Sequence, residues 1–260
     1  MFGRDPEAYA RARLPYPNRV YDILRSRCGL RAGAAVFEIG PGTGIATREL
    51  LRWGANPLTL VERDRRLAGF LSGSLGPGER RVTMRIGPFE RAVLRPRSFD
   101  LGVAATSFHW LPERPALRKI AGLLKPGGWW ASWNTYHGDP FRPTPFQRAL
   151  RPLYRELAGG RSPRRSAREA AARDRRQRLD ALRSVERFDR ISREDIHWSV
   201  TLEAAHIRAL WGTFSDIVTL PPGRRERFLN QLEGVVNEQF GGRARIAVLT
   251  PMHTARRQTD

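Results

Sequence analysis

Apolar and polar positions follow two alternating patterns along the first half of the chain. Short apolar runs, typical of strands buried on both faces, lie at 34–40, 57–62, 81–86, 99–106 and 128–136. Between the runs, apolar residues recur every three or four positions, as on one face of a helix. The clearest such residues are Ala46, Leu50, Trp53, Leu117, Ile120, Ala121 and Leu124. Strands that alternate with helices predict right-handed crossovers and a parallel sheet covered on both faces.

Capping residues, prolines and glycines indicate the ends of several predicted helices. Asp5 and Pro6 suit the cap and the first position of a helix, and the first 34 residues read as two short helices broken at "LPYPN". "KPGG" (125–128) is predicted to stop the helix that precedes the fifth apolar run. The ligand site of such a sheet is expected beyond the carboxyl ends of its strands.

The regular alternation ends at residue 137. "DPFRPTPF" is a proline-rich loop, and an arginine-dense helix is predicted from 161 onward. Within that helix Ser166 and Glu169 form a capping box. Glu169–Arg173 and Asp174–Arg178 are predicted ion pairs with the i,i+4 spacing of one helix face.

The last third of the chain returns to a mixed pattern. A sixth strand is predicted within 187–200 and a last strand at 243–254, with two amphipathic helices between them. We therefore predict an α/β, Rossmann-like fold in four parts. These are an N-terminal helical segment (1–34), a Rossmann-like core (35–136), an arginine-rich helical cap (137–185) and a C-terminal part that completes the sheet (186–260).

Length and composition narrow the function classes. At 260 residues and 40% apolar content, the chain suits one sizeable globular domain. It has no apolar run near the ~18 residues of a membrane span, and its charged start has no signal-peptide character, so a cytoplasmic protein is expected. The single cysteine, Cys28, excludes an intramolecular disulfide and a cysteine-rich metal site. No HExxH or comparable cluster occurs, so no metal is expected.

The charge is strongly basic, with a formal value of +20 and a pI of about 11.5. Such a charge is typical of proteins that bind nucleic acid or anionic membranes. However, only Lys119 and Lys125 are lysines, and every other basic residue is arginine. Two interpretations stay open: the bias of a GC-rich, bacterial genome, or a surface for an anionic partner.

Candidate chemistry begins at "FEIGPGTG", residues 37–44. Its glycines have the spacing G-x-G-x-G, and Glu38 lies two positions before the first of them. A dinucleotide fold uses G-x-G-x-x-G, and a phosphate loop needs G-K-S/T where this chain has Gly44-Ile45-Ala46. A carboxylate at Glu38 repels a phosphate but accepts hydrogen bonds from an ammonium or a hydroxyl group. The predicted ligand is a nucleoside without phosphates that carries a cation.

"FEIGPGTG", "LTLVERD", "FDLGVAATSFHW" and "LLKPGGWW", in this order, resemble class I S-adenosylmethionine-dependent methyltransferases. The N-terminal "YARARLPYP" (9–17) is similar to the bacterial small-molecule group of methyltransferase type 11, which includes trans-aconitate-methyltransferase-like proteins. The resemblance covers about 1–150 and 186–257. It implies a mostly parallel, seven-stranded sheet with a helical cap, and S-adenosyl-L-methionine as cofactor, with S-adenosyl-L-homocysteine as product.

The resemblance also implies roles for individual residues at the cofactor. Gly40, Gly42 and Gly44 would let the backbone approach the methionine part and the ribose, with Glu38 near the ammonium group. Glu62 would accept from both ribose hydroxyls, and Arg63 and Phe89 would flank the adenine. The remaining cofactor residues implied are Tyr9, Arg13 (for the carboxylate), Thr43 and Ala105. In one departure, Pro88 stands about where many relatives have an Asp that accepts from the adenine amino group, which leaves Phe89, Glu90 or backbone groups for this contact.

The acceptor side is less defined. A phenol or alcohol acceptor needs its proton removed, whereas a carboxylate acceptor needs no base. His109, beyond the fourth predicted strand, is the first candidate base and His137 the second; each has a structural alternative as a wall residue. Candidate pocket residues are Tyr16, Trp110, Trp133, Tyr136 and Phe141, with packing as the alternative for each.

The expected activity is methyl transfer to oxygen or nitrogen of a small-molecule acceptor, and an anionic acceptor is among the candidates. The expected assembly is a monomer or a homodimer. Two alternatives stay open: an RNA methyltransferase, and a methyltransferase-fold protein that binds the cofactor without methylating. The segment 161–178 contains no aromatic residue to stack on bases, which disfavours RNA binding there. That segment is either a solvated helix or a gate that attracts an anionic substrate.

Overall fold

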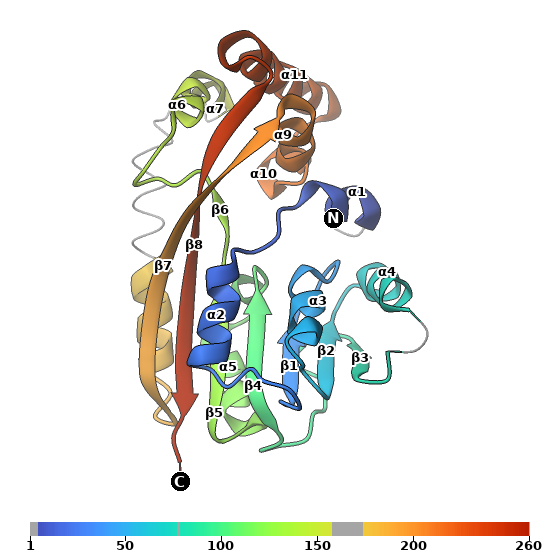
Figure 1. The fold of residues 1–260 in the computed structure, drawn as a ribbon, viewed down its shortest axis with the longest axis vertical. Helices are drawn as coiled ribbons and strands as arrows, with labels where there is room; N and C mark the ends of the chain where they lie inside the picture. The colour runs from blue at the N-terminus through green and yellow to red at the C-terminus, as the bar shows by residue number, and fades with distance from the viewer. Residues whose placement is uncertain (1–4, 77–78, 158–173, 260) are drawn as a thin grey trace.

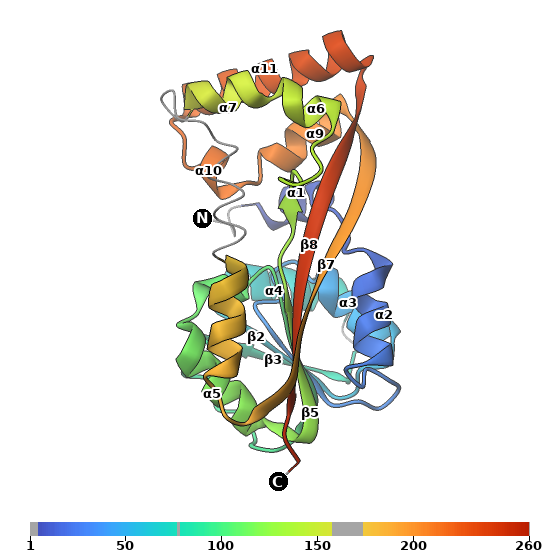
Figure 2. The same ribbon diagram turned by 90° about the vertical axis from the view of Figure 1, so that its left-hand side faces the viewer.

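A computed structural model describes residues 5–76, 79–157 and 174–259. The molecule has a lower body, built on a sheet, and an upper helical cap, and two long strands run from one into the other (Figure 1). Helices cover both faces of the sheet in the lower body (Figure 2). None of the helices in the described ranges is both long and apolar enough to cross a membrane.

The parallel half of the sheet forms as predicted from the apolar runs. Its strands are β1 (Val36–Ile39), β2 (Leu58–Glu62), β3 (Val82–Ile86), β4 (Phe99–Ala105) and β5 (Leu124–Trp133). They lie in the order β3-β2-β1-β4-β5, and neighbours pair in parallel. All four residues of β1 are buried, because helices cover both faces of this central strand.

Two hydrophobic clusters fill the space on either side of this sheet. On one face, α2 (Asn18–Ser26) and α3 (Ile45–Arg52) pack through residues such as Ile23 and Leu50, and α4 (Arg65–Leu75) adds Leu71. On the other face lie α5 (Glu113–Leu123), through Leu117 and Ile120, and the helical residues 174–183. The apolar spacing that predicted helices here also supplies the residues that they bury.

The antiparallel half of the sheet is larger than predicted. β7 (Phe188–Glu203) and β8 (Arg243–Arg257) extend beyond the predicted 187–200 and 243–254. β8 pairs antiparallel with β5, with β7 and with the two-residue β6 (Tyr136–His137). The sheet thus has eight strands among the described residues, where seven were expected, because the predicted strand 128–136 is divided into β5 and β6.

The helix ends before "KPGG", as predicted, but the strand begins earlier than the predicted residue 128. Helix α5 ends at Leu123, and β5 begins at Leu124 and includes 125–128. The register between β4 and β5 shifts between Phe99 and Leu101, so an irregularity in the pairing absorbs the proline and glycines within the strand. The signal ends the helix, and pairing with β4 brings the same residues into the strand.

The cap draws on two separate parts of the chain. Its helices are α6 (Pro145–Ala149), α7 (Arg151–Leu157), α9 (Ala204–Trp211), α10 (Ser215–Val218) and α11 (Pro222–Phe240). They share one hydrophobic cluster that includes Phe146, Ile207 and Leu232. The helices of the 204–240 segment, assigned from sequence to the completion of the sheet, therefore pack with α6 in the cap.

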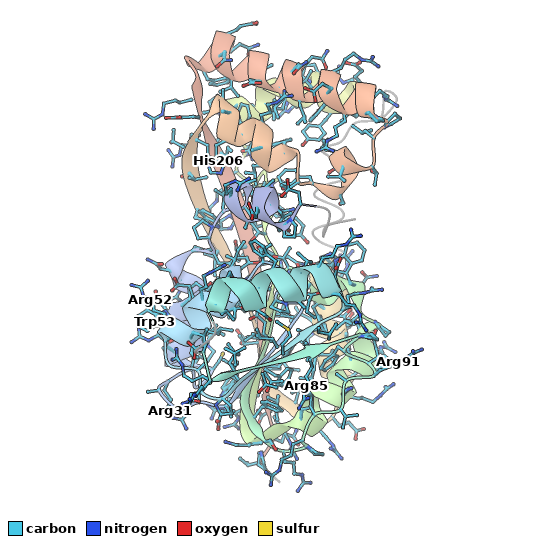
Figure 3. All side chains as sticks on the ribbon, turned by 90° about the vertical axis from the view of Figure 1, so that its right-hand side faces the viewer. Arg31, Arg52, Trp53, Arg85, Arg91 and His206 are labelled. Atoms are coloured by element: carbon cyan, nitrogen blue, oxygen red, sulfur yellow. The ribbon has the colours of Figure 1, made fainter. Side chains whose placement is uncertain are left out.

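Helix α1 (Pro6–Ala12) lies between the lower body and the cap (Figure 1). Asp5 caps it by accepting from the Ala8 amide at 2.8 Å, as predicted. His206 of α9 lies beside α1 (Figure 3), where its Nε2 donates to the Ala12 carbonyl at 3.1 Å. The predicted capping box of Ser166 and Glu169 and the Glu169–Arg173 pair lie outside the described residues, whereas the Asp174–Arg178 ion pair is confirmed, at 3.4 Å.

Candidate active site

A cavity of about 1380 Å³ opens at the carboxyl ends of the parallel strands. Residues that follow β1, end β2, follow β3 and follow β4 form its floor and walls. Its roof comes from the N-terminal segment, through Tyr9, Arg13 and Tyr16, and from α10, through Ser215 and Thr219. The sequence predicted a site at this edge of the sheet but did not identify Ser215 and Thr219 as part of it.

The glycine turn gives the floor its shape. Gly40 has a φ of +63°, and a Cβ added there would lie 2.7 Å from the Cβ of Ser107. Gly42 also has a positive φ, +59°, but an added Cβ would meet no protein atom within 4 Å. The chain therefore requires glycine for its conformation at both positions, and at Gly42 it also leaves open space beside the cavity.

Glu38 is a buried carboxylate with one free oxygen. It is 1% exposed; Thr47 Oγ1 donates to its Oε2 at 2.7 Å, and its Oε1 has no partner among the described residues. Burial raises its pKa to about 7, the Thr47 bond opposes the rise, and the nearby Glu62 adds to it. The Oγ1 of Thr43, in the same turn, is also buried without a partner in this part of the chain. Both atoms belong to residues that line the cavity.

Glu62, the last residue of β2, is held in a fixed orientation. Its Oε2 accepts from the Gly42 amide at 3.0 Å and its Oε1 from the Asp64 amide at 2.9 Å. Burial raises its pKa, while these backbone bonds lower it. Each carboxylate oxygen can accept a second hydrogen bond, so Glu62 can serve two neighbouring hydroxyl groups.

The roof carries an unbalanced cation. Arg13 donates to the Thr213 carbonyl at 3.2 Å, and its guanidinium lies 4.8 Å from the Tyr9 ring centre and 5.2 Å from that of Phe214. Among the described residues no acidic side chain forms an ion pair with it, and its Nε is buried without a partner. Arg13 can therefore receive an anionic group of a ligand in the cavity.

Tyr16 connects the roof to the end of β4. Its hydroxyl lies 3.1 Å from Thr106 Oγ1, and its ring packs edge-on against Trp133, with centres 5.5 Å apart. Burial raises the Tyr16 pKa well above its usual value, so the phenol stays protonated. Thr106 has a φ of +56°, an uncommon conformation for threonine that is found at functional sites. Thr106 lies within "FDLGVAATSFHW" but was not among the predicted site residues.

The wall after β3 differs from the predicted arrangement. Phe89 lines the cavity but is only 2% exposed, because its ring stacks on Phe37 with centres 6.2 Å apart. It can offer a ligand no more than an edge. Arg63, Glu90 and Ala105 also line the cavity.

His109 lies on the wall after β4, in the short helix η2 (Phe108–Trp110). Burial lowers its pKa, the charge of Arg178 lowers it further, and a hydrogen bond with Asn134 opposes both. The imidazole is therefore neutral at pH 7 and can accept a proton. Its neighbour Trp110, 58% exposed, also lines the cavity, with ring centres 4.8 Å apart.

His137, on β6, does not line the cavity. It is buried 5.0 Å from the ring centre of Phe214, and its Nε2 has no partner within the described ranges. Burial lowers its pKa to about 3, and the charge of Arg13 contributes to the same shift.

The five candidate pocket residues separate into two groups. Tyr16 and Trp110 line the cavity. The other three do not: Trp133 is 2% exposed in the hydrophobic core, the Tyr136 hydroxyl donates to Asp174 at 3.4 Å, and Phe141 is an exposed residue at 46%. The aromatic residues of β5 and β6 thus have structural contacts: Trp133 packs in the core and against Tyr16 of the roof, and Tyr136 contacts the helix that contains Asp174.

Comparison with known proteins assigns the domain. Residues 37–132 match the family model described as a methyltransferase domain. The chain contains a class I S-adenosylmethionine-dependent methyltransferase domain. A solved structure from Anaeromyxobacter dehalogenans, described as a type II methyltransferase, matches with a TM-score of 0.64 at 17% identity, covering 95% of this chain and 98% of that one. The predicted family and the Rossmann-like fold are confirmed.

Curated relatives of the methyltransferase domain are matched over part of their length. The ribosomal RNA small subunit methyltransferase A of Gloeobacter violaceus is 35% identical over 105 residues, which are 40% of this chain and 36% of the relative. The dimethylglycine N-methyltransferase of Parasynechococcus marenigrum is 30% identical over 115 residues, 42% of this chain and 40% of the relative. The chain spans about half the length of the first curated relatives it matches.

The residues at the floor of the methyltransferase domain fit its cofactor, S-adenosylmethionine. The unpartnered oxygen of Glu38 suits an ammonium group, and the unpartnered Thr43 hydroxyl suits a second polar contact. The fixed Glu62 carboxylate suits a pair of ribose hydroxyls. A phosphate would be repelled by both carboxylates, in agreement with the interpretation of the G-x-G-x-G spacing.

Part of the basic charge lies on the surface of the lower body. Arg31, Arg52 and Arg85 lie on the surface of the lower body (Figure 3). Trp53, which lies among them, is 4.0 Å below the Arg25 guanidinium and 5.9 Å from that of Arg52, measured to its ring centre. The aromatic ring is thus engaged by the protein's own arginines.

Proposed function

We propose that the protein transfers a methyl group from S-adenosylmethionine to an oxygen or nitrogen atom of a small-molecule acceptor. The observation that carries the proposal is one cavity that combines the free oxygen of Glu38, the oriented carboxylate of Glu62 and the neutral imidazole of His109. When bound, the cofactor supplies an electrophilic methyl group on a sulfonium. The protein's task is to position the reactants and to exclude water.

Three charged residues would hold the cofactor. Glu38 would accept from the ammonium group, Glu62 from the ribose hydroxyls, and Arg13 would pair with the carboxylate. This arrangement matches each ligand group to a protein group that otherwise lacks a partner or has acceptor capacity left. The nucleoside would then run outward along the strand ends, from β1 past β2 toward the loop after β3.

His109 would accept the proton of a hydroxyl acceptor. Its lowered pKa keeps the ring nitrogen unprotonated at neutral pH, and the exposed face of Trp110 beside it suits a flat or apolar acceptor. For an acceptor that is already a carboxylate, His109 would orient the substrate without taking a proton. The similarity to the dimethylglycine N-methyltransferase supports a small acceptor.

RNA methylation is the second candidate. The charge of +20 and the similarity to a ribosomal RNA methyltransferase favour it. The roof of the cavity argues against it, because α10 and the segment 9–16 cover the space above the strand ends. An RNA affinity that falls steeply with salt would favour RNA over a small molecule.

Calorimetric titration with S-adenosylmethionine and S-adenosylhomocysteine tests the cofactor, and a screen of phenols, carboxylates and amines with methyl-labelled cofactor tests the acceptor. We expect micromolar binding of both cofactor forms and labelled product from one acceptor class. Absence of binding by a folded sample would refute the cofactor assignment. Binding without transfer to any small acceptor, together with transfer to RNA, would replace the first proposal with the second.

A further inference from the structure

The loop after β3 borders the cavity beside Glu62. The Gly87 amide donates to the Glu62 carbonyl at 2.8 Å, and the chain then turns, with the Arg91 amide donating to the Pro88 carbonyl at 3.0 Å. Gly87, Pro88, Phe89, Glu90 and Arg91 all line the cavity. The loop is therefore fixed to the residue that is proposed to bind the ribose.

Lys119 holds this loop from the other side. It lies on α5, and its Nζ donates to the carbonyls of Phe89 at 2.6 Å, Glu90 at 3.1 Å and Ala92 at 2.7 Å. The Nζ also lies 4.9 Å from the ring centre of Phe89. An ammonium group has three N–H donors, so this one lysine uses all of them on carbonyls of a single turn.

The residue type matters at this position. Arginine supplies almost all of the basic residues in this chain, and Lys119 is one of only two lysines. A compact ammonium can direct three donors toward carbonyls that converge on one point, whereas the planar guanidinium of arginine spreads its donors in a rigid fork. The three carbonyls around Nζ therefore need lysine.

The side chains of the loop leave recognition mostly to its main chain. Gly87 has no side chain, Pro88 has no polar group, and Phe89 is 2% exposed. Glu90 and Arg91, at the end of the turn, have exposed polar side chains. A base bound here would meet main-chain groups, and their directions are set by the carbonyls that Lys119 draws to the opposite side.

We propose that Lys119 is a positioning residue that shapes the adenine-binding end of the cofactor site. The proposal rests on the cofactor placement given under the proposed function. Adjacent strand ends lie about 4.8 Å apart, so an elongated nucleoside with its ammonium at Glu38 and its ribose at Glu62 brings the base to the loop after β3. Removing the ammonium would take this donor from the Glu90 and Ala92 carbonyls and would leave the Phe89 carbonyl with only the Ala92 amide, at 3.2 Å, so the loop would rearrange.

The test compares ligands with and without the base in the full-length protein. We would measure dissociation constants of S-adenosylhomocysteine and of S-ribosylhomocysteine, which lacks adenine, by direct and displacement calorimetry for the wild type, Lys119→Met and Lys119→Arg. We expect about a 10-fold loss or more for S-adenosylhomocysteine in both variants, the scale of a lost set of hydrogen bonds. S-ribosylhomocysteine should bind with an unchanged constant, and arginine should fail to rescue.

Lys125→Met is the matched control. Lys125, the other lysine, binds both carboxylate oxygens of Asp100 at 2.9 Å, and Asp100 accepts from the Ala35 amide at the start of β1, at the end of the sheet away from the cavity. This variant should change neither dissociation constant, whatever its effect on melting temperature.

Four outcomes would overturn the proposal. Equal weakening of both ligands by Lys119→Met would show a general structural role, and unchanged binding of both would show no role. Wild-type affinity of Lys119→Arg for S-adenosylhomocysteine would contradict the need for a compact ammonium group at this position. Wild-type protein that is folded but binds neither ligand would instead refute the cofactor placement itself, and the proposal with it.

Discussion

Replacement of Glu38 by glutamine should stabilise the ligand-free protein at alkaline pH. Burial raises the pKa of this carboxyl from 4.5 to about 7, so between these values the folded state binds more protons at this site than the unfolded state does. Stability therefore falls as the pH rises through this window. Above it, the charged carboxylate lowers the free energy of unfolding by the equivalent of the full pKa shift. At 1.36 kcal/mol per pKa unit, that cost is about 3 kcal/mol.

Glutamine avoids the cost and preserves the packing. Its amide oxygen can still accept from Thr47, which now binds Glu38 Oε2 at 2.7 Å. Chemical denaturation at pH 5 and pH 8 measures the effect. We expect a gain in the free energy of unfolding of up to about 3 kcal/mol at pH 8 and a much smaller gain at pH 5. A similar change at both pH values, or a loss at pH 8, would refute the assignment of a buried charge.

The same substitution, Glu38→Gln, should weaken binding of the cofactor. The Oε1 atom, which has no partner among the residues that the structure describes, is the group proposed for the cofactor's ammonium, and a charge-assisted bond of this kind is worth about 1.5–3 kcal/mol. Calorimetry with S-adenosylhomocysteine at pH 8 should show this loss in Glu38→Gln. Glu49→Ala, which removes a carboxylate of α3 that pairs with Arg52 at 3.6 Å outside the cavity, is the control and should bind like the wild type.

Three further predictions concern the rest of the cavity. Glu62→Ala should weaken S-adenosylhomocysteine binding by about 1–3 kcal/mol in calorimetry, because the ribose acceptor is lost; unchanged binding would contradict that role. His109→Gln should lower kcat about 100-fold or more for a hydroxyl acceptor; an unchanged kcat would show that His109 only lines the cavity. Because the pKa of His109 is lowered, the wild-type kcat should decline only below the usual histidine range near pH 6.5. Tyr16→Phe should cost about 1 kcal/mol of stability by denaturation, since the bond to Thr106 is lost; no change would mean that this bond contributes nothing.

The parallel core could be predicted because its signals are local. Each apolar run is long enough to be a strand, and parallel pairing brings Gly40 and Glu62 to one edge whatever the distant parts of the chain do. The G-x-G-x-G spacing and the preceding carboxylate are also contiguous in sequence. These features define the floor of the site without any knowledge of the cap.

The remaining features depend on contacts between distant residues. Phe89 is buried because Phe37 stacks on it, and Phe37 in turn fits against Gly102, where an added Cβ would lie 2.3 Å from the ring. Lys119 reaches a loop about 30 positions away in sequence. The helices of 204–240 join the cap because β7 leads the chain into the cap and the antiparallel β8 leads it back to the lower body. No local pattern marks any of these.

The same two charged residues, Glu38 and Arg13, lower the stability of the ligand-free protein and prepare the cavity to bind a ligand. Glu38 on the floor has a free oxygen and a pKa raised by burial, and Arg13 in the roof has no acidic partner within the described part of the chain. Within the described ranges, neither charge forms an ion pair with the other or with another charged side chain. A ligand that carries an ammonium and a carboxylate on one carbon can offset both costs at once. The cavity is therefore better matched to an amino-acid zwitterion than to a simple nucleoside, as the methionine part of S-adenosylmethionine requires.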